Sequence, residues 1–212
     1  MSKAKPAPRL PASAYKSEYM RYAGRIGRTP KERLQWLLGT LNEFKRHGGQ
    51  EWVAGDWDIL RGAFAVFTTG DFSTPGYGAI ASTGGVLDEK PSTSEVKDIL
   101  EKCLEIIERV ADHKPVEFDR IAVRPSLHWI EGMNPKRYVL MQEPDDNATW
   151  IMRVCYPLAK MISAEGQRIL RCSARRPHER FGCGRFFVKN KRGKYCGQAC
   201  TSRETSRRKR KP

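Results

Sequence analysis

The chain of 212 residues lacks long apolar runs, and we therefore expect neither a secretory signal nor a membrane span. Residues 1–6 read Met-Ser-Lys-Ala-Lys-Pro and are not followed by the stretch of about 7 to 15 apolar residues that a secretory signal requires. No run approaches the roughly 18 apolar residues of a membrane span. We therefore expect a soluble, cytoplasmic protein without a membrane partner. In a reducing compartment, its six cysteines should be thiols or metal ligands and not disulfides.

Acidic residues are scarce at the C-terminal end of the chain. Residues 168–212 hold 16 Lys or Arg and 2 Asp or Glu, a net charge of +14, whereas the whole chain carries +15. Residues 1–33 carry +7 and residues 34–167 carry −6. A local positive charge of this size predicts a polyanionic partner, and nucleic acid is the commonest large polyanion in a cell. The acidic middle part would compete with that partner for the basic segments.

Sequence motifs of familiar enzymes are also absent. The chain has no zinc-protease helix motif, nucleophile elbow or deaminase signature. The glycine-rich residues 70–86 lack the Gly-Lys-Ser/Thr ending of a phosphate-binding loop, so we interpret them as a connecting loop. We interpret His128, in a predicted strand, as structural. We expect no catalytic residues, and an enzyme acting on nucleic acid through an unrecognised site is the second alternative only.

The residues that are present predict an α+β fold, with a mainly helical body, a short antiparallel β segment and a small C-terminal zinc-finger module of treble-clef type. Capping boxes begin at Thr29 and Ser92, and apolar residues then recur at helical spacing. The expected helices cover residues 30–47, 56–68, 148–163 and the stretch from Ser92 to just before Pro115. Residues 118–123, 127–130 and 137–141 predict two or three strands, separated by Pro125 and by residues 132–135.

Four cysteines near the C-terminus have the spacing Cys172-x10-Cys183-x12-Cys196-x3-Cys200. Zinc prefers four tetrahedral ligands, and two thiolate pairs from a hairpin and a helix start would provide them. Cys196 and Cys200 would share one face of a helix that begins at Cys196. Residues 190–194 are expected to form the hairpin turn. The pattern predicts one structural zinc ion per chain, with no open position for a reactive water.

The composition of residues 168–212 also indicates a need for metal. Their large apolar residues are few: Ile169, Leu170, Phe181, Phe186, Phe187, Val188 and Tyr195. An independent fold of this size would need more, and structural zinc can supply about 10 to 16 kcal/mol. The surrounding cations should lower the thiol pKa values. His178 could replace Cys172 as a ligand. Cys103 and Cys155 lie in apolar helical patterns and should be buried.

The cysteine segment resembles the CGNR zinc finger in three stretches: Ile169-Leu170-Arg171-Cys172, Cys183-Gly184-Arg185-Phe186-Phe187 and Lys194-Tyr195-Cys196. It departs from that finger in the inserted residues 173–182, and in Thr201-Ser202-Arg203 where the family has Gly-Asn-Arg. The upstream part is similar to the ABATE region that precedes this finger in bacterial proteins. The resemblance implies four zinc ligands, at Cys172, Cys183, Cys196 and Cys200, and a DNA-binding transcriptional regulator linked to stress responses.

These observations lead to a domain organisation and a function. We expect a flexible basic arm over 1–28, an ABATE-like body over 29–167, a four-cysteine zinc finger over 168–203 and a basic tail over 204–212. The expected function is zinc-dependent nucleic-acid binding, with DNA preferred over RNA, possible nucleoid association in a bacterium, and an RNA- or ribosome-associated protein as the alternative. The body could bind a small effector or a protein partner, and the oligomeric state is open. Phosphate contacts are expected from Arg185, Lys189, Lys191, Arg192, Lys194, Arg203, Arg207, Arg208, Lys209 and Arg210.

Overall fold

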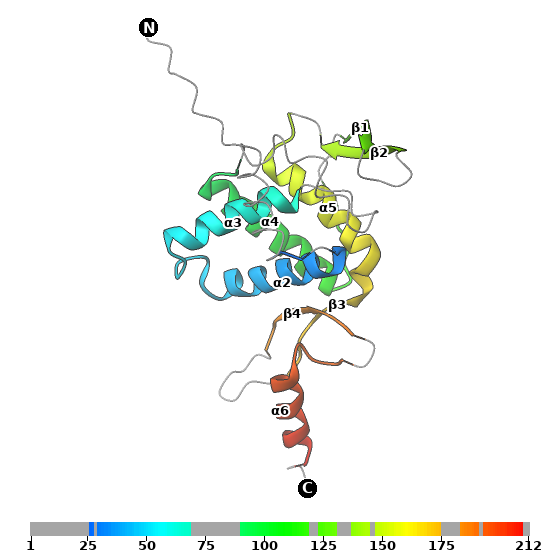
Figure 1. Ribbon diagram of the computed structural model, residues 1–212. Coiled ribbons are helices and arrows are strands. Elements are labelled where there is room, and N and C mark those ends of the chain that lie inside the picture. The colour runs from blue at the N-terminus through cyan, green and yellow to red at the C-terminus, as the bar shows by residue number, and fades with distance from the viewer. Residues whose placement is uncertain are drawn as a thin grey trace.

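A computed structural model shows a helical body with a small β module and a further helix at its C-terminal end (Figure 1). It describes residues 26–27, 29–68, 90–118, 123–130, 137–144, 147–174, 183–190 and 193–209. Three predicted segments lie outside these ranges in whole or in large part. They are the basic arm, the glycine-rich residues 70–86 and the inserted segment between Cys172 and Cys183. Within the described ranges, the α+β class is confirmed.

Helix α2 (Pro30–His47) has the predicted bounds because both of its ends carry local signals. The Thr29 side chain accepts a hydrogen bond from the backbone N–H of Glu32, and the Glu32 carboxylate accepts one from the Thr29 N–H. This reciprocal pair satisfies two N–H groups that the helix itself leaves without partners. At the other end, Gly48 takes a left-handed conformation with φ of 61°, which glycine adopts without a steric penalty.

Three further helices complete the body: α3 (Ala54–Phe67), α4 (Thr93–Ala111) and α5 (Trp150–Glu165). They pack with α2 around one apolar core. The predicted apolar stripe of α4 is buried throughout: Val96, Ile99, Leu100, Cys103, Ile106, Ile107 and Val110. Cys155 of α5 is also buried, as expected. None of the described helices combines the length and the apolar character that crossing a bilayer requires.

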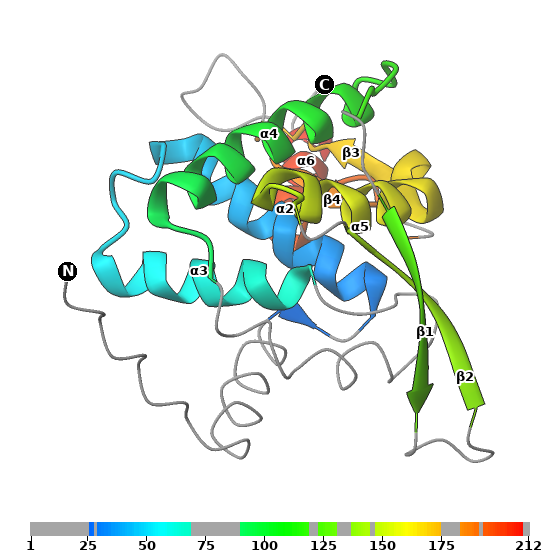
Figure 2. The same ribbon diagram turned by 90° about the horizontal axis from the view of Figure 1, so that it is seen from above.

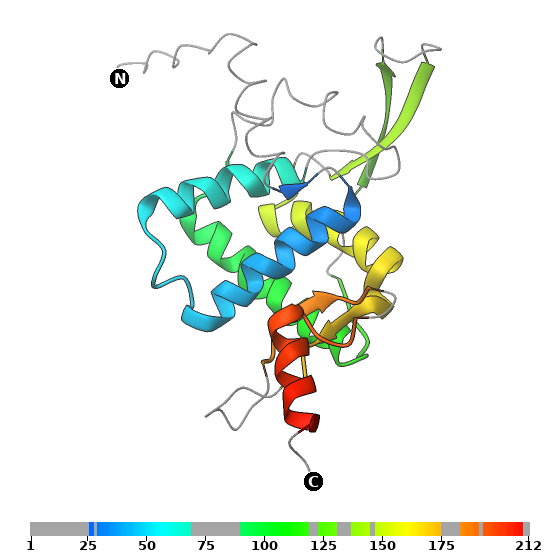
Figure 3. The same ribbon diagram turned by 60° about the horizontal axis from the view of Figure 1, so that its bottom comes forward.

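Two antiparallel strands, β1 (Val123–Ile130) and β2 (Arg137–Pro144), form a ribbon beside the helices (Figure 2). The prediction that Pro125 separates two strands is wrong, because Pro125 lies inside β1 and is paired with Gln142. A two-stranded sheet has only edge strands, so the missing N–H of a proline need not interrupt the ladder. The ribbon lies at the end of the body opposite the C-terminal helix (Figure 3).

After α5, a 3-10 turn (Gly166–Arg168) leads into β3 (Ile169–Arg171), which pairs antiparallel with β4 (Phe186–Val188). The last described element is α6 (Gln198–Lys209). The buried side chains of Ile169, Phe186 and Val188 belong to the same apolar core as the helices of the body. Strand β4 lies against α2, and β3 lies against α4. The β3–β4 hairpin is therefore attached to the body through a shared core.

Candidate metal centre

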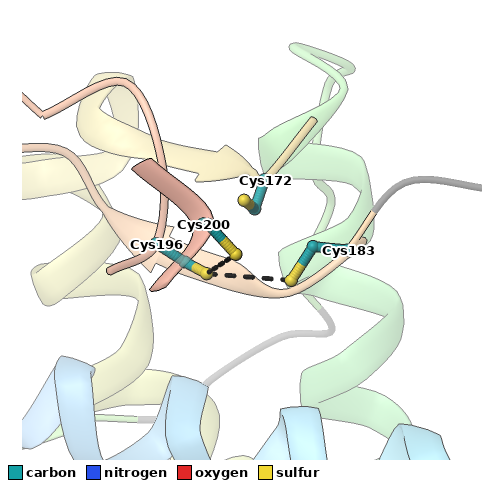
Figure 4. A group of neighbouring side chains, drawn as sticks. All are labelled: Cys172, Cys183, Cys196 and Cys200. Carbon is teal, nitrogen blue, oxygen red and sulfur yellow. Dashed lines mark hydrogen bonds between the residues drawn. The ribbon is translucent and has the colours of Figure 1, made fainter. Parts of the chain in front are cut away.

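The four C-terminal cysteines converge on one point, although up to 28 positions of sequence separate them (Figure 4). Their sulfur atoms all lie within 4.8 Å of one another. The Cys183 and Cys196 sulfurs are 3.7 Å apart, and those of Cys196 and Cys200 are 3.6 Å apart. Four sulfurs at about 2.3 Å from a tetrahedral ion would lie about 3.8 Å from one another. The cluster therefore has the dimensions of a tetrathiolate metal site.

The same distances argue against disulfides. All four cysteines are free thiols, and a disulfide would bring two sulfurs to about 2.05 Å. His178, the alternative ligand, lies outside the described residues. With four sulfurs already converging, the described residues supply a full tetrahedral set without a histidine.

Cys172 and Cys183 are positioned by an extension of the β3–β4 ladder. The Cys172 N–H donates to the Arg185 carbonyl at 2.8 Å, and the Cys172 carbonyl accepts from the Gly184 N–H at 3.0 Å. The Cys183 N–H donates to the Ala174 carbonyl at 2.6 Å. Gly184 has a φ of 66°, a left-handed conformation that favours glycine at this turn after Cys183. The two sulfurs are thus placed by backbone that is itself anchored in the body.

Cys196 and Cys200 come from the start of the last helix, but not in the predicted way. Helix α6 begins at Gln198, so only Cys200 is helical, and Cys196 lies in the bend that precedes the helix. The expected hairpin across residues 190–194 is also wrong. A turn does close there, because the Gly193 N–H donates to the Asn190 carbonyl at 3.0 Å, but no strand follows it in residues 193–209. The hairpin partner of β4 is β3, which precedes it in the chain.

The pKa values of two of the thiols are raised, whereas nearby cations were expected to lower them. Burial raises the pKa of the Cys200 thiol above its ordinary value. Burial, and then hydrogen bonding with the neighbouring thiols, in which Cys196 donates to Cys200, also raises the pKa of Cys196. The causes of both shifts are burial and the neighbouring cysteines, and not nearby arginines or lysines. A metal ion must displace protons to bind, and its affinity must increase with pH.

The packing around the cysteines is separate from the core of the body. Cys172, Ala174 and Cys200 form a second small buried cluster, against which Phe187, Tyr195 and the other two cysteines pack. Three of the large apolar side chains counted toward this segment, Ile169, Phe186 and Val188, instead belong to the core of the body. The hairpin therefore does not depend on metal alone. The segment that follows β4, including α6, has few apolar contacts.

The side chains predicted to contact phosphate are not all exposed in the structure. Six of them belong to the described residues and are exposed: Arg185, Lys189, Lys194, Arg207, Arg208 and Lys209. Two of these form ion pairs: Arg185 lies 3.5 Å from Glu43 of α2, and the Arg207 Nε lies 3.1 Å from the Glu204 carboxylate. Arg203 is half-buried. Lys191, Arg192 and Arg210 lie outside the described residues.

Sequence reasoning missed the contacts that join the cysteine segment to the body. The Asn42 side chain of α2 pairs with the backbone of Phe186 in β4. Arg171 of β3 lies 3.2 Å from Asp112, just after α4. The Phe186 ring also lies beneath two cations, with Lys45 at 5.0 Å and Arg171 at 5.3 Å from its centroid. No local pattern signals such contacts, because each joins residues far apart in the sequence.

Comparisons of the chain with protein-family models, with curated proteins and with solved structures find no match. Two points therefore stay predictions: that the cysteine segment is a CGNR zinc finger and that the body is ABATE-like. The domain boundaries based on these two points also stay predictions. The four converging thiols stand independently of that resemblance, since they follow from the geometry of the described residues.

Proposed function

We propose that this chain is a zinc-dependent nucleic-acid-binding protein with DNA as its preferred partner. The observation that carries the proposal is the position of the thiol cluster at the base of α6, a helix whose far end is cationic and exposed. A metal held there would fix the helix to the body and present its basic end to a polyanion.

Zinc is the metal that the donor set favours. Four sulfur donors in a tetrahedral arrangement suit zinc, whose coordination geometry is set by its ligands. A site with four protein ligands leaves no position for a water or a substrate, so the metal would have a structural role. The residues that would hold it are Cys172, Cys183, Cys196 and Cys200.

The distribution of charge favours binding through the cysteine segment and not through the body. Residues 168–212 carry +14, and the body over 34–167 carries −6. On the described surface, Lys189, Lys194, Arg208 and Lys209 are exposed. Such side chains neutralise phosphates and release counterions, which makes the binding depend strongly on salt.

A role in transcription regulation is part of the proposal and is drawn from the resemblance to CGNR zinc fingers. In that reading the helical body would respond to a small effector or a protein partner. Its connection to the cysteine segment through the shared core gives a route by which a change in the body could reach α6.

The proposed nucleic-acid binding is tested by the salt dependence of affinity for a mixed-sequence duplex. The zinc-loaded protein is compared with the variant Arg208→Gln/Lys209→Gln on α6. The control variant is Lys97→Gln/Lys114→Gln, which removes two exposed cations from the body. Each lost phosphate contact should reduce the slope of log K against log salt by about 0.9. The proposal predicts a reduced slope for the α6 variant alone. Affinity that hardly changes with salt, or equal effects of the two variants, would contradict it.

A further inference from the structure

We propose that α6 enters the major groove of duplex DNA and reads base edges through a face of short hydroxyl side chains. The inference rests on the proposed function and deepens it, because it commits to one form of nucleic acid and to the residues that face it. Five features of α6 support it: its projection from the body, the arrangement of its side chains, the state of its hydroxyl groups, the position of its cations and its dimensions.

Helix α6 projects away from the helical body, and its C-terminal end points outward (Figures 1 and 3). Its buried side chains are Cys200, which joins the thiol cluster, and Glu204, one turn further on. All residues from Thr205 to Lys209 are exposed. The helix is thus held at its first turns and is open to a partner along the rest of its length.

The exposed side chains of α6 are not evenly mixed around the helix. With about 100° per residue, Thr201, Thr205, Ser202 and Ser206 fall within an arc of about 140°. Cys200 and Glu204 lie on the opposite side, which faces the thiol cluster and the small buried core. The surface turned away from the protein therefore carries the four shortest polar side chains of the helix, with Gln198 at its N-terminal end and Lys209 at its C-terminal end. A polar stripe needed only for solubility would not require short side chains.

The hydroxyl groups on this face are of two kinds. The Thr201 hydroxyl donates to the Gly197 carbonyl at 3.1 Å, and the Thr205 hydroxyl donates to the Thr201 carbonyl at 2.9 Å. Their protons are therefore used within the helix, which leaves acceptor lone pairs and methyl groups outward. Ser202 and Ser206 have no hydrogen-bond partner among the described residues. Acceptors, rotatable hydroxyls and methyl groups are suited to the amino groups and the thymine methyl of the major groove.

Cations lie at the C-terminal end of the hydroxyl face. Arg208 lies at one edge of the arc, and Lys209 lies within the arc in the last turn of the helix. Long basic side chains at this end can reach phosphates while the short side chains nearer the start of α6 approach the bases. Arg207 is turned to the other side and is paired with Glu204 at 3.1 Å. The face therefore offers cations to the phosphates at its C-terminal end and uncharged hydroxyl side chains to the bases nearer its start.

The dimensions of α6 favour duplex DNA over duplex RNA. A helix with its side chains is about 10 to 12 Å across, and the major groove of B-form DNA is about 12 Å wide. The nine residues from Thr201 to Lys209 extend about 13 Å along the helix axis. The major groove of A-form RNA is too deep and narrow for side chains to read. Among folded nucleic acids, B-form DNA is thus the partner that fits this face.

The test begins with the zinc-loaded full chain and a library of random duplex DNA, from which the best-bound sequences are selected. These sequences are then made as duplex DNA, duplex RNA and single-stranded DNA. We expect duplex DNA to bind at least about 10-fold more tightly than duplex RNA at equal salt. Replacing guanine with 7-deazaguanine, or thymine with uracil, should weaken binding because each change alters the major groove. Replacing guanine with inosine alters the minor groove and should have little effect.

Variants of α6 link the groove to the hydroxyl face. Ser202→Ala/Ser206→Ala removes the two hydroxyls that no described residue partners and keeps α6 folded, since Ala is the stronger helix former. It should reduce the preference for selected over unselected duplex by about 5-fold or more, with binding to unselected duplex within about 2-fold of wild type. The control Ser163→Ala changes an exposed serine of α5 and should have no effect. Ser202→Thr/Ser206→Thr retains the hydroxyls and should restore part of the preference.

Each unfavourable result has a distinct meaning. Duplex binding could depend on salt but show no sequence preference, or the alanine variant could show the same preference as wild type. Either result would overturn the proposal that α6 reads bases in the major groove and would leave the proposed nucleic-acid binding intact. Tighter binding to RNA or to single strands would overturn the groove reading and replace DNA as the partner. If no nucleic acid binds in the zinc-loaded state, the proposed function itself is wrong.

Discussion

The Asn42 side chain of α2 forms two hydrogen bonds with the backbone of Phe186 in β4. Its Nδ2 donates to the Phe186 carbonyl at 3.0 Å, and its Oδ1 accepts from the Phe186 N–H at 2.8 Å. These backbone groups lie on the open edge of β4, the side not paired with β3. One carboxamide thus takes the place that a further strand would occupy. The body and the cysteine segment are joined at this point by polar contacts as well as by the shared core.

Replacing Asn42 with alanine should weaken this junction. The variant leaves a half-buried N–H and carbonyl of Phe186 without their partner, and we expect the free energy of unfolding to fall by about 1 to 3 kcal/mol. Urea denaturation measures the change, and hydrogen exchange at the Phe186 amide should become faster. The control Asn147→Ala removes an exposed asparagine and should stay within about 0.5 kcal/mol of wild type. Equal stability of the two variants would contradict a structural role for Asn42.

Metal removal should unfold α6 and leave the body folded. Ile169, Phe186 and Val188 are held in the core of the body, whereas α6 has 12 residues, of which only Cys200 and Glu204 are buried. Isolated helices shorter than about 12 to 15 residues are marginal in water. Treatment with a chelator should therefore abolish amide protection in α6 and retain it in α2 and α4, as hydrogen exchange would show. Loss of protection throughout the body would mean that the metal stabilises the whole chain.

The acidic body should reduce the affinity for nucleic acid by pairing with basic residues of the cysteine segment. Glu43 pairs with Arg185 at 3.5 Å, and Asp112 pairs with Arg171 at 3.2 Å. Exposed pairs contribute at most about 1 kcal/mol, so Glu43→Gln/Asp112→Asn should raise affinity by about 2-fold to 5-fold at low salt. The gain should shrink as salt increases, because salt already screens these pairs.

The control for this competition is Glu101→Gln/Asp98→Asn, which neutralises one Glu and one Asp on the exposed surface of α4. It changes the net charge by the same amount without releasing a paired arginine. Fluorescence anisotropy with a labelled duplex compares the variants. If both variants raise affinity equally, the effect comes from net charge alone and the two pairs do not compete with phosphate.

Stability should fall at alkaline pH because of Cys103. Burial, and then the neighbouring Cys155, raises the pKa of this thiol well above its ordinary value of 9.0. Above that pH the unfolded chain loses the thiol proton while the folded chain keeps it, so stability present at lower pH is lost at a rate of up to about 1.4 kcal/mol per pH unit. Urea midpoints of the zinc-loaded protein from about pH 8 to about pH 10 should fall more steeply for wild type than for Cys103→Ala. Parallel curves would contradict this assignment.

The elements that were predictable from sequence are those whose signals are local. The bounds of α2 follow from the reciprocal contacts of Thr29 and Glu32 and from Gly48, all within one turn of its ends. The buried stripe of α4 follows from apolar spacing alone. The cysteines were predicted to act together because of their residue type and spacing, and their sulfurs do converge.

The features that sequence reasoning missed depend on contacts between distant residues. The turn residues near Gly193 suggested that β4 would pair with a strand that follows it in the chain. Instead, β4 pairs with β3, which precedes it, and the inserted segment connects the two strands. The apolar side chains of this hairpin were counted toward a separate module, yet Ile169 and Phe186 lie in the core of the body. The role of Asn42 has no sequence signal, because an asparagine within a helix has no local feature that marks a strand edge as its partner.

The metal content of the purified protein, measured together with its binding to duplex DNA, tests whether the four thiols hold zinc and whether that zinc is needed for binding. We expect one zinc ion per chain in wild type, and loss of both zinc and binding in Cys196→Ser. Cys155→Ala, which changes a buried thiol outside the cluster, should retain both. Zinc absent from wild type would contradict a zinc site at the four thiols, and DNA binding that persists in the zinc-free Cys196→Ser variant would contradict zinc-dependent binding.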